Sequence, residues 1–299
     1  MRAGIDIGGT NVKIGLVDGT GRLAASVSVP TRGERRAAEV LGEVGRQVLA
    51  LLDSRGLRPE ECLGVGVGVP GTVDREAGVV LYSNNLRWEN VPLAELLRLP
   101  MPVRAANDAD CAALGEAVAG AGKGRRRVVL ITLGTGVGGG VILDGRILSG
   151  SELGHMVIIE NGESCTCGRR GCLEAYASAT ALKRDGARAA GRPVEPEEVF
   201  AAAAAGDPRM TEVVDAYLRR LGTGVVNIVN LFRPQAVLLG GGLSRQGETL
   251  LAPLRAMVRE QCFGGARGGL PEIREALLGN RAGMIGAASL IGADIPGGA

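Results

Sequence analysis

The stretch GIDIGGTNVKIGLVD, residues 4–18, places two runs of strand-forming residues on either side of a glycine turn. Alternating apolar and β-branched residues favour strands, and a short glycine-containing connection between two such runs is typical of a hairpin. We therefore predict strands over residues 2–8 and 12–18. The same pattern returns as RVVLITLGTGVGGGVILDG at residues 127–145. The repeated strand–turn–strand unit indicates a loose internal duplication.

The rest of the chain mixes helical and strand-like segments, which is typical of an α/β protein. Periodic apolar positions predict helices over residues 34–54 and 174–190. No long Ser- or Pro-rich linker occurs, so two α/β domains with a cleft between them fit the sequence better than separate modules. We expect an N-terminal α/β domain over 1–115 that is joined by a C-terminal helix over 283–299, and a larger C-terminal α/β domain over 116–282.

Composition and charge exclude several classes of protein. The formal net charge is only +2, and the short basic stretch 125–127 has no interleaved aromatic residues, so nothing favours a nucleic-acid partner. No window of about 20 apolar residues is free of glycine and charge, so we expect no transmembrane helix and no membrane partner. The chain opens on a strand-like run without a basic and apolar leader. We therefore expect a cytoplasmic protein.

Three glycine-rich stretches could hold an anion: DIGGTNVK (6–13), TLGTGVGGG (132–140) and GGGLS (240–244). Glycine lets backbone N–H groups approach a phosphate closely, and threonine adds a hydroxyl donor. Each stretch alone could be an ordinary β-turn, but two matched turns favour a nucleotide that is gripped from both domains. Asp6, beside the first turn, could hold the Mg²⁺ of that nucleotide or simply cap the turn.

Two common nucleotide-binding motifs are excluded. GTGVGG (134–139) satisfies G-x-G-x-x-G, but a dinucleotide-binding fingerprint needs a helix directly after the glycines, and here the strand VILDG follows. No G-x-x-x-x-G-K-[ST] occurs in the sequence, so the chain is not a P-loop enzyme.

Carboxylates gather at the predicted start of a helix in NDADCAALGEAVAG, residues 107–120. Asn and Asp are preferred helix N-caps, and capping alone would explain Asn107 and Asp110. Phosphoryl transfer to a hydroxyl needs one carboxylate to take or orient the hydroxyl proton. Asp108, which lies between the two glycine turns in the sequence, fits that role.

These motifs, in this order, resemble the ROK family of sugar kinases and related regulators. The resemblance rests on DIGGTNVKIGLVD, NDADCAALGE, LGTGVGGG, ELGH followed by CTCGRRGCLE, and VLLGGG, and it spans nearly the whole chain. It implies a two-domain actin-like ATPase (ribonuclease H-like) fold that binds ATP and Mg²⁺. Regulators of this family carry an N-terminal helix-turn-helix domain, whereas this chain begins at the phosphate motif, so we expect a kinase. Family resemblance also favours a homodimer.

The resemblance implies roles for individual residues, with Asp108 as the catalytic base on the sugar hydroxyl. Sugar contacts are implied for Gly71, Thr72, Asn84, Asn85, Asn107, Asp108, Glu152, His155 and Glu174. Nucleotide contacts are implied for Asp6, Gly8, Gly9, Thr10, Asn11, Lys13, Gly134, Thr135, Gly136, Gly241 and Gly242. Structural zinc ligands are implied at His155, Cys165, Cys167 and Cys172.

The cysteine-rich stretch SCTCGRRGCLEAY, residues 164–176, follows the only histidine of the chain. Structural zinc sites use four tetrahedral nitrogen or sulfur ligands, and three thiolates with the His155 imidazole would complete one such shell. The alternatives are free thiols in a reducing compartment and a disulfide between Cys165 and Cys172. A zinc ion would fix both ends of the segment that carries Glu152 and Glu174.

The expected activity is ATP-dependent phosphorylation of a hexose at its terminal hydroxyl, with glucose as the first choice of substrate. N-acetylmannosamine and fructose are alternatives, because the residues that the resemblance assigns to the sugar are shared across them. The segment GRILSGSELGH (145–155), which helps to shape the sugar pocket, is also several residues shorter than in many ROK members. A sugar-sensing regulator without catalysis is the second hypothesis. It would need a missing base, damaged phosphate turns or an attached DNA-binding domain, and the sequence has none of these.

Overall fold

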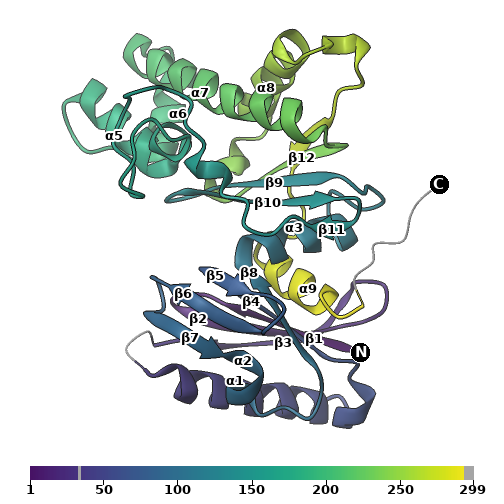
Figure 1. Ribbon diagram of the computed structural model, residues 1–299. Helices are drawn as coiled ribbons and strands as arrows, with labels where there is room; N and C mark the ends of the chain where they lie inside the picture. Colours follow the sequence, from purple (N-terminus) through teal and green to yellow (C-terminus); the bar gives the residue numbers. More distant parts are fainter. Residues whose placement is uncertain (33–34, 293–299) are drawn as a thin grey trace. The chain divides into compact units, whose positions relative to one another are not determined.

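The computed structural model describes residues 1–32 and 35–292, which pack as two compact units (Figure 1). The first unit contains the described residues up to Arg126, residues Gly140–Gly150 and those from Leu277 on. The second contains Arg127–Gly139 and Ser151–Ala276. The expected domains, 1–115 with 283–299 and 116–282, stay a prediction. Residues 293–299 of the expected last helix lie outside the described residues.

The first five-stranded sheet is built on the hairpin that opens the chain. β1 (Arg2–Ile7) pairs antiparallel with β2 (Asn11–Val17), which confirms the predicted hairpin. The strand order is β3-β2-β1-β4-β8. The other strands are β3 (Leu23–Pro30), antiparallel to β2, and β4 (Val65–Val69) and β8 (Val103–Asn107), which continue the sheet in parallel with β1.

Parallel pairing brings three chain segments to one edge of this sheet. Val69 of β4 lies opposite Asn107 of β8, and Gly68 lies opposite Asp6 of β1. Because parallel strands end at the same edge, the turn after β1, the loop after β4 and the helix after β8 all begin there. The sheet therefore gathers residues that are about 100 positions apart in the sequence.

Helices cover both faces of the first sheet (Figure 1). The longest, α1, buries Val40, Val44, Val48 and Leu52 at helical spacing, which agrees with the periodicity expected over 34–54. The helices of this unit are α1 (Ala37–Asp53), α2 (Leu93–Leu97), α3 (Asp108–Ala119) and α9 (Ala282–Ser289). A small antiparallel sheet contains β5 (Thr72–Asp74), β6 (Val79–Ser83) and β7 (Trp88–Pro92).

Helix α9 packs backbone to backbone against its neighbours through glycine. A Cβ atom added at Gly286 would lie 1.6 Å from the carbonyl oxygen of Cys111 in α3. A Cβ atom added at Gly66 in β4 would lie 1.6 Å from the carbonyl oxygen of Ala287 in α9. No side chain fits at these separations, so glycine is required for α9 to sit between α3 and the sheet.

We expect Gly286→Ala to destabilise the first unit by about 1–3 kcal/mol or more, because the added methyl group must push α9 away from α3. Denaturant unfolding should show a lower midpoint. Gly42→Ala in α1 is the matched control, since its nearest neighbour would be Arg46 Nη1 at 3.9 Å. That variant should be stabilised by up to about 1 kcal/mol through helix propensity. Equal midpoints for Gly286→Ala and the wild type would refute the close-packing account.

The second five-stranded sheet repeats the order of the first. Its order is β11-β10-β9-β12-β13, in which a short strand and a hairpin are followed by two parallel strands. The duplication predicted for residues 127–145 is therefore visible, and it extends beyond the hairpin to the next two strands. The strands are β9 (Val128–Leu133), β10 (Val137–Leu143), β11 (Arg146–Ile147), β12 (Ala236–Gly240) and β13 (Glu272–Glu275).

The remaining helices belong to the second unit. The single helix expected over 174–190 is wrong, because Ser178 has an extended backbone (φ −82°, ψ 162°) and its hydroxyl accepts the N–H of Ala181. Ser178 thus ends one helix and caps the next. The helices are α4 (Glu174–Ala177), α5 (Ala179–Ala190), α6 (Pro196–Ala204), α7 (Pro208–Phe232) and α8 (Glu248–Gln261).

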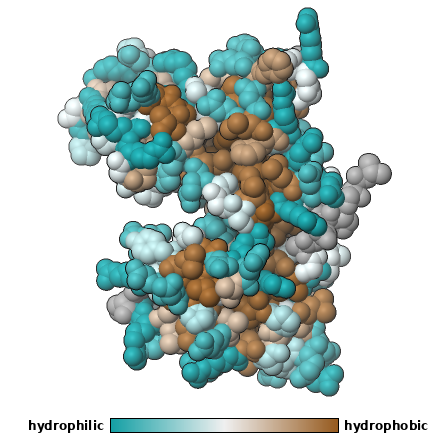
Figure 2. Space-filling view, in the orientation of Figure 1, coloured by the Kyte–Doolittle hydropathy of each residue, from teal (hydrophilic) through white to brown (hydrophobic). Residues whose placement is uncertain are grey.

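On the face shown in Figure 2, hydrophilic residues are spread over both units, and hydrophobic patches lie among these hydrophilic residues. In the described part of the chain, no helix combines the length and the apolar character that crossing a membrane requires.

Candidate active site

The first glycine turn is held in shape by Thr31, the residue directly after β3. The buried Thr31 hydroxyl donates to the Gly8 carbonyl at 2.7 Å, and the Thr31 N–H donates to the Thr10 carbonyl at 2.8 Å. Thr31 therefore donates a hydrogen bond to each of these two turn carbonyls. Among the described residues, the N–H groups of Gly9 and Thr10 have no hydrogen-bond partner, and both residues are exposed. Such N–H groups are suited to binding an anion.

Asp6 stands at the end of β1, directly before this turn. Its carboxylate lies 3.9 Å from the Lys13 ammonium on the paired strand, and its side chain is only 20% exposed. Burial raises the pKa of Asp6, the Lys13 charge lowers it, and the Asp108 charge raises it further. Asp6 and Asp108 are thus close enough to repel each other, which is an arrangement that favours a shared cation.

Asn107 and Asp108 occupy the junction between β8 and α3. The Asn107 amide oxygen accepts the N–H groups of Ala109 at 2.8 Å and Asp110 at 3.3 Å, so Asn107 is the N-cap of α3. Its amide nitrogen donates to the Gly71 carbonyl at 3.1 Å. One side chain therefore fixes the start of α3 to the loop after β4. Asp108 is the first helical residue and is half-buried.

The predicted sugar-loop residues of the first unit lie directly before β5, at its first residue and in the connection after β6. Gly71 has φ +112°, and a Cβ atom there would lie 2.2 Å from the Tyr82 carbonyl oxygen, so this position requires glycine. The Tyr82 hydroxyl donates to the Asn84 side-chain oxygen at 3.2 Å. Asn84, Asn85 and Thr72 are exposed, so their side chains are accessible to a ligand.

The second glycine turn, residues 134–136, is braced by the start of α5. The Thr180 hydroxyl donates to the Thr135 carbonyl at 2.7 Å, and the Ala179 N–H donates to the Gly134 carbonyl at 2.8 Å. Within the described chain, the N–H groups of Thr135 and Gly136 have no hydrogen-bond partner. The second turn thus repeats the plan of the first, with carbonyls braced by a distant threonine and N–H groups left accessible.

The third glycine stretch lies beside the second turn. A Cβ atom at Gly241 would lie 2.3 Å from the Leu133 carbonyl oxygen, and Gly241 has φ +85°. Gly242 begins the short helix η3 (Gly242–Gln246), and an added Cβ there would meet nothing within 4 Å. The parallel pairing of β9 with β12 therefore brings the two glycine stretches of the second unit together, as their common assignment to the nucleotide requires.

His155, Cys165, Cys167 and Cys172 come together in the second unit. Their ligand atoms all lie within 4.8 Å of one another. The Cys165 sulfur is 3.6 Å from His155 Nδ1, and the Cys167 and Cys172 sulfurs are 3.7 Å apart. Zinc bonds of about 2.0–2.3 Å in a tetrahedron need ligand separations of about 3.3–3.8 Å. The donor set and its spacing therefore fit a tetrahedral metal ion after small adjustments.

Two short segments form this cluster. His155 ends the short helix η2 (Leu153–His155), and Val157 forms an isolated β-bridge with Cys172. The hairpin after Glu163 carries the other ligands and is closed by the Cys165 N–H donating to the Arg169 carbonyl at 2.9 Å. Burial raises the pKa of the Cys172 thiol to about 12, so a metal must displace its proton to bind.

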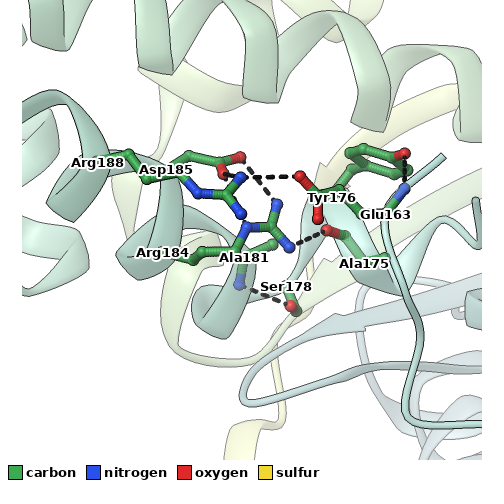
Figure 3. A network of polar contacts seen from close by, with 8 residues as sticks. All are labelled: Glu163, Ala175, Tyr176, Ser178, Ala181, Arg184, Asp185 and Arg188. Atoms are coloured by element: carbon green, nitrogen blue, oxygen red, sulfur yellow. Dashed lines mark hydrogen bonds and ion pairs between the residues drawn. The ribbon is translucent and has the colours of Figure 1, made fainter.

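A polar network holds the hairpin of residues 163–172 against α5 (Figure 3). The Glu163 carboxylate accepts a hydrogen bond from the Arg188 guanidinium at 2.8 Å. The Glu163 backbone N–H donates to the Tyr176 hydroxyl at 2.6 Å. The Arg188 side chain also donates to Asp185 at 3.4 Å, and Arg184 donates to the Ala175 carbonyl at 3.0 Å. The base of the hairpin is thus fixed by charge-assisted contacts.

Comparison with known proteins identifies the family. The ROK family pattern matches residues 2–293. The chain belongs to the ROK family. The glucokinase of Thermotoga maritima is 38% identical over 96% of this chain and 96% of its own length. The ROK hexokinase structure from Thermus thermophilus has a TM-score of 0.83 and 35% identity, with 96% of each chain covered. A Streptomyces griseus ROK glucokinase, solved with glucose and AMPPNP, has a TM-score of 0.74 and 34% identity over 97% of this chain and 98% of its own.

The likeness to these ROK structures confirms the expected fold class, a two-domain α/β fold of the actin-like ATPase type. The predicted site residues form two sets, one in each unit. Asp6, Gly71, Asn107 and Asp108 gather at the edge of the first sheet. In the second unit, the glycine turn and Glu174 are in contact, and the four metal-ligand candidates are clustered. Glu152 directly precedes η2 and is exposed.

Several residues that shape this ROK site were missed in the sequence. Thr31 and Thr180 brace the two turns from 21 or more residues away, and no local motif marks them. Thr166, between two cysteines, donates to Glu174 at 2.8 Å. Outside the site, buried Glu116 accepts the N–H groups of Ala121, Leu277 and Leu278 at 2.7–3.1 Å. The only sequence signal for Glu116 was its place in the NDADCAALGE motif.

Proposed function

We propose that this ROK protein is an ATP-dependent sugar kinase that phosphorylates the terminal hydroxyl of a hexose, with glucose as the first choice. Glucokinase relatives of nearly equal length, and a related structure solved with glucose and AMPPNP, support this choice. One observation carries the proposal. Each of two matched glycine turns has braced carbonyls and accessible N–H groups, and a half-buried carboxylate, Asp108, starts a helix at the edge next to the first turn.

In the proposed reaction, Asp108 accepts the proton of the terminal sugar hydroxyl as its oxygen attacks the γ-phosphorus. The new oxygen–phosphorus bond forms while the bond from the γ-phosphorus to the bridging oxygen breaks, and ADP leaves. Asn107 fixes the start of α3 and the Gly71 loop together, which holds Asp108 in place. The N–H groups of Gly9, Thr10, Thr135 and Gly136 neutralise phosphate charge.

Asp6 is proposed to hold the Mg²⁺ of the nucleotide, whose charge would screen the phosphates. The Asp6 carboxylate fits a cation, because burial raises its pKa, the Asp108 charge raises it further, and a nearby positive charge would stabilise the ionised form. Further nucleotide contacts are proposed at Gly8, Asn11, Lys13, Gly134, Gly241 and Gly242. Sugar contacts are proposed at Gly71, Thr72, Asn84, Asn85, Asn107, Glu152, His155 and Glu174.

We propose structural zinc at His155, Cys165, Cys167 and Cys172. Four soft or borderline ligands in a closed shell leave no open position for water, so the ion would stabilise the segment rather than take part in the reaction. A homodimer and a cytoplasmic location are further proposals that rest on the family resemblance and the sequence.

Asp6→Asn is expected to raise stability and to lower Mg²⁺-dependent turnover by about 100-fold or more. Because the pKa of Asp6 is raised from 3.8, the folded state binds its proton more tightly than the unfolded chain does. The stability that the protonated Asp6 contributes is therefore fully present below the pKa of Asp6 in the unfolded chain. It is lost as the pH rises through the raised pKa of the folded state. In Mg²⁺-free denaturation, the gain from Asp6→Asn should be larger at about pH 7 than at about pH 4. A gain that shrinks with rising pH would contradict this account.

A sugar panel tests the proposed function. Sugar phosphate formation is measured with glucose, N-acetylmannosamine and fructose, each with ATP or polyphosphate as phosphoryl donor, and ADP release is followed where ATP is the donor. Sugar-dependent ADP release that is fastest with glucose is expected. If only a sugar other than glucose is turned over, glucose is the wrong substrate. Tight sugar binding without any turnover would favour the sugar-sensing regulator instead.

A further inference from the structure

Glu174 connects two parts of the second unit that the proposed function treats separately. We call residues 163–172 the metal loop and residues 134–136 the second glycine turn. Each carboxylate oxygen of Glu174, the first residue of α4, serves one of them. We propose that Glu174 is a positioning residue that couples the two, so that metal binding and nucleotide binding strengthen each other. This inference rests on the proposed function, which assigns the nucleotide to the turn.

On one side, Glu174 supports the backbone of the second glycine turn. Its Oε2 atom accepts the Val137 N–H at 3.0 Å. A Cβ atom at Gly136 would lie 2.4 Å from the same oxygen, so the carboxylate packs directly on the turn. The position and direction of the Gly136 peptide, whose N–H has no hydrogen-bond partner in the described chain, therefore depend on Glu174.

The metal loop holds the other oxygen of Glu174. The Thr166 hydroxyl donates to Oε1 at 2.8 Å, and the Cys165 sulfur lies 3.7 Å from it. Thr166 stands between the metal-ligand candidates Cys165 and Cys167, so a bound metal would fix its backbone on both sides. When Cys165 is a metal-bound thiolate it no longer donates a proton, and the Thr166 hydroxyl becomes the connection to Glu174.

A second contact joins the segment of His155 to the same strand. A Cβ atom at Gly154 would lie 1.9 Å from the Val137 carbonyl oxygen, so η2 packs against the backbone of β10 where the turn ends. The Val137 N–H thus donates a hydrogen bond to Glu174, and the Val137 carbonyl packs against the segment that ends in His155. The base of the metal loop is independently fixed by Glu163 and Arg188 (Figure 3). Metal loss should therefore loosen the tip of the loop first.

Coupling between two binding sites is reciprocal. If metal binding orders Thr166 and Glu174 and thereby the turn, the factor by which metal strengthens nucleotide binding equals the factor by which nucleotide strengthens metal binding. The second factor is measurable without turnover. In the wild type, we expect AMPPNP to raise zinc affinity by about 5-fold or more, and zinc to raise AMPPNP affinity equally.

Thr166→Val removes the hydroxyl at constant shape, and Thr166→Ser is the matched control that keeps it. Zinc affinity is measured by competition with a chromogenic chelator, with and without AMPPNP, and AMPPNP affinity by calorimetry on the zinc-loaded protein. Thr166→Val should bind one zinc ion but reduce the coupling factor to nearly one, whereas Thr166→Ser should retain it. Circular dichroism checks that both variants are folded.

Glu174→Gln and Glu174→Ala separate positioning from charge. A glutamine carbonyl can accept the Val137 N–H while its amide nitrogen donates to the Thr166 oxygen, so Glu174→Gln should retain most of the coupling and Glu174→Ala should lose it. If AMPPNP binds normally but the zinc affinity of the wild type is the same with and without AMPPNP, this inference alone is overturned. No AMPPNP binding in any form of the protein would overturn the proposed function, and the inference with it.

Discussion

Replacing Asp108 with asparagine is expected to lower kcat for sugar phosphorylation by about 10²–10⁴-fold, because the side chain can no longer accept the hydroxyl proton. The start of α3 should be unchanged. The Asp108 Oδ1 atom accepts the Ala109 N–H at 3.0 Å, which an asparagine oxygen can also do, and Asn107 supplies the N-cap. KM for both substrates should stay within a few-fold, because the lost interaction belongs to the transition state.

Asp144→Asn is the matched control for Asp108→Asn. Asp144 is an exposed carboxylate of the same unit in the left-handed conformation (φ 49°), which asparagine tolerates well. Its kcat should equal that of the wild type. Steady-state kinetics and thermal melting of both variants provide the comparison. If Asp108→Asn kept wild-type kcat, Asp108 would not be the base.

Cys172→Ser is expected to abolish stable metal binding and to cause a large loss of stability. Cys172 is fully buried and contributes one of four ligand atoms, so the remaining three form an incomplete shell. Metal analysis should fall from about one zinc per chain to a small fraction of that. The melting temperature should drop, and KM for the sugar should rise, because Glu152 and His155 lie on the segment that the ion fixes.

Cys262→Ala provides the control, because Cys262 is a buried cysteine outside the cluster. It should keep its zinc and lose only the packing energy of one sulfur, about 1 kcal/mol. Treating the wild type with a chelator should reproduce the Cys172→Ser phenotype, and adding zinc back should reverse it. Metal-free wild type with full activity and an unchanged melting temperature would rule out the structural metal.

The sequence was sufficient for the features that local residue patterns encode. The hairpin around Gly8–Thr10, its repeat around Gly134–Gly136, and the helix that begins after Asn107 follow from strand alternation, glycine turns and N-capping. The four metal-ligand candidates could be grouped because cysteine and histidine are rare in this chain. The family resemblance then supplied the fold class and the candidate roles.

Contacts between distant segments could not be predicted from those patterns. Thr31 and Thr180 look like ordinary threonines in the sequence, and only the folded chain places them beside the turns, Thr31 through the pairing of β3 with β2 and Thr180 at the start of α5. The break at Ser178 was missed because the apolar periodicity continues through it, while its hydroxyl favours a cap. Glu174 was interpreted as a sugar contact alone, since its contact with Val137 requires knowing that β10 lies beside α4.

The most direct test of the proposed activity is phosphorus NMR of the zinc-loaded protein incubated with glucose, ATP and Mg²⁺. We expect stoichiometric formation of ADP and glucose 6-phosphate, with the new phosphate ester on the terminal hydroxyl and none formed when glucose is omitted. Intact ATP and unmodified glucose after prolonged incubation of the folded, metal-loaded protein would contradict the proposed activity.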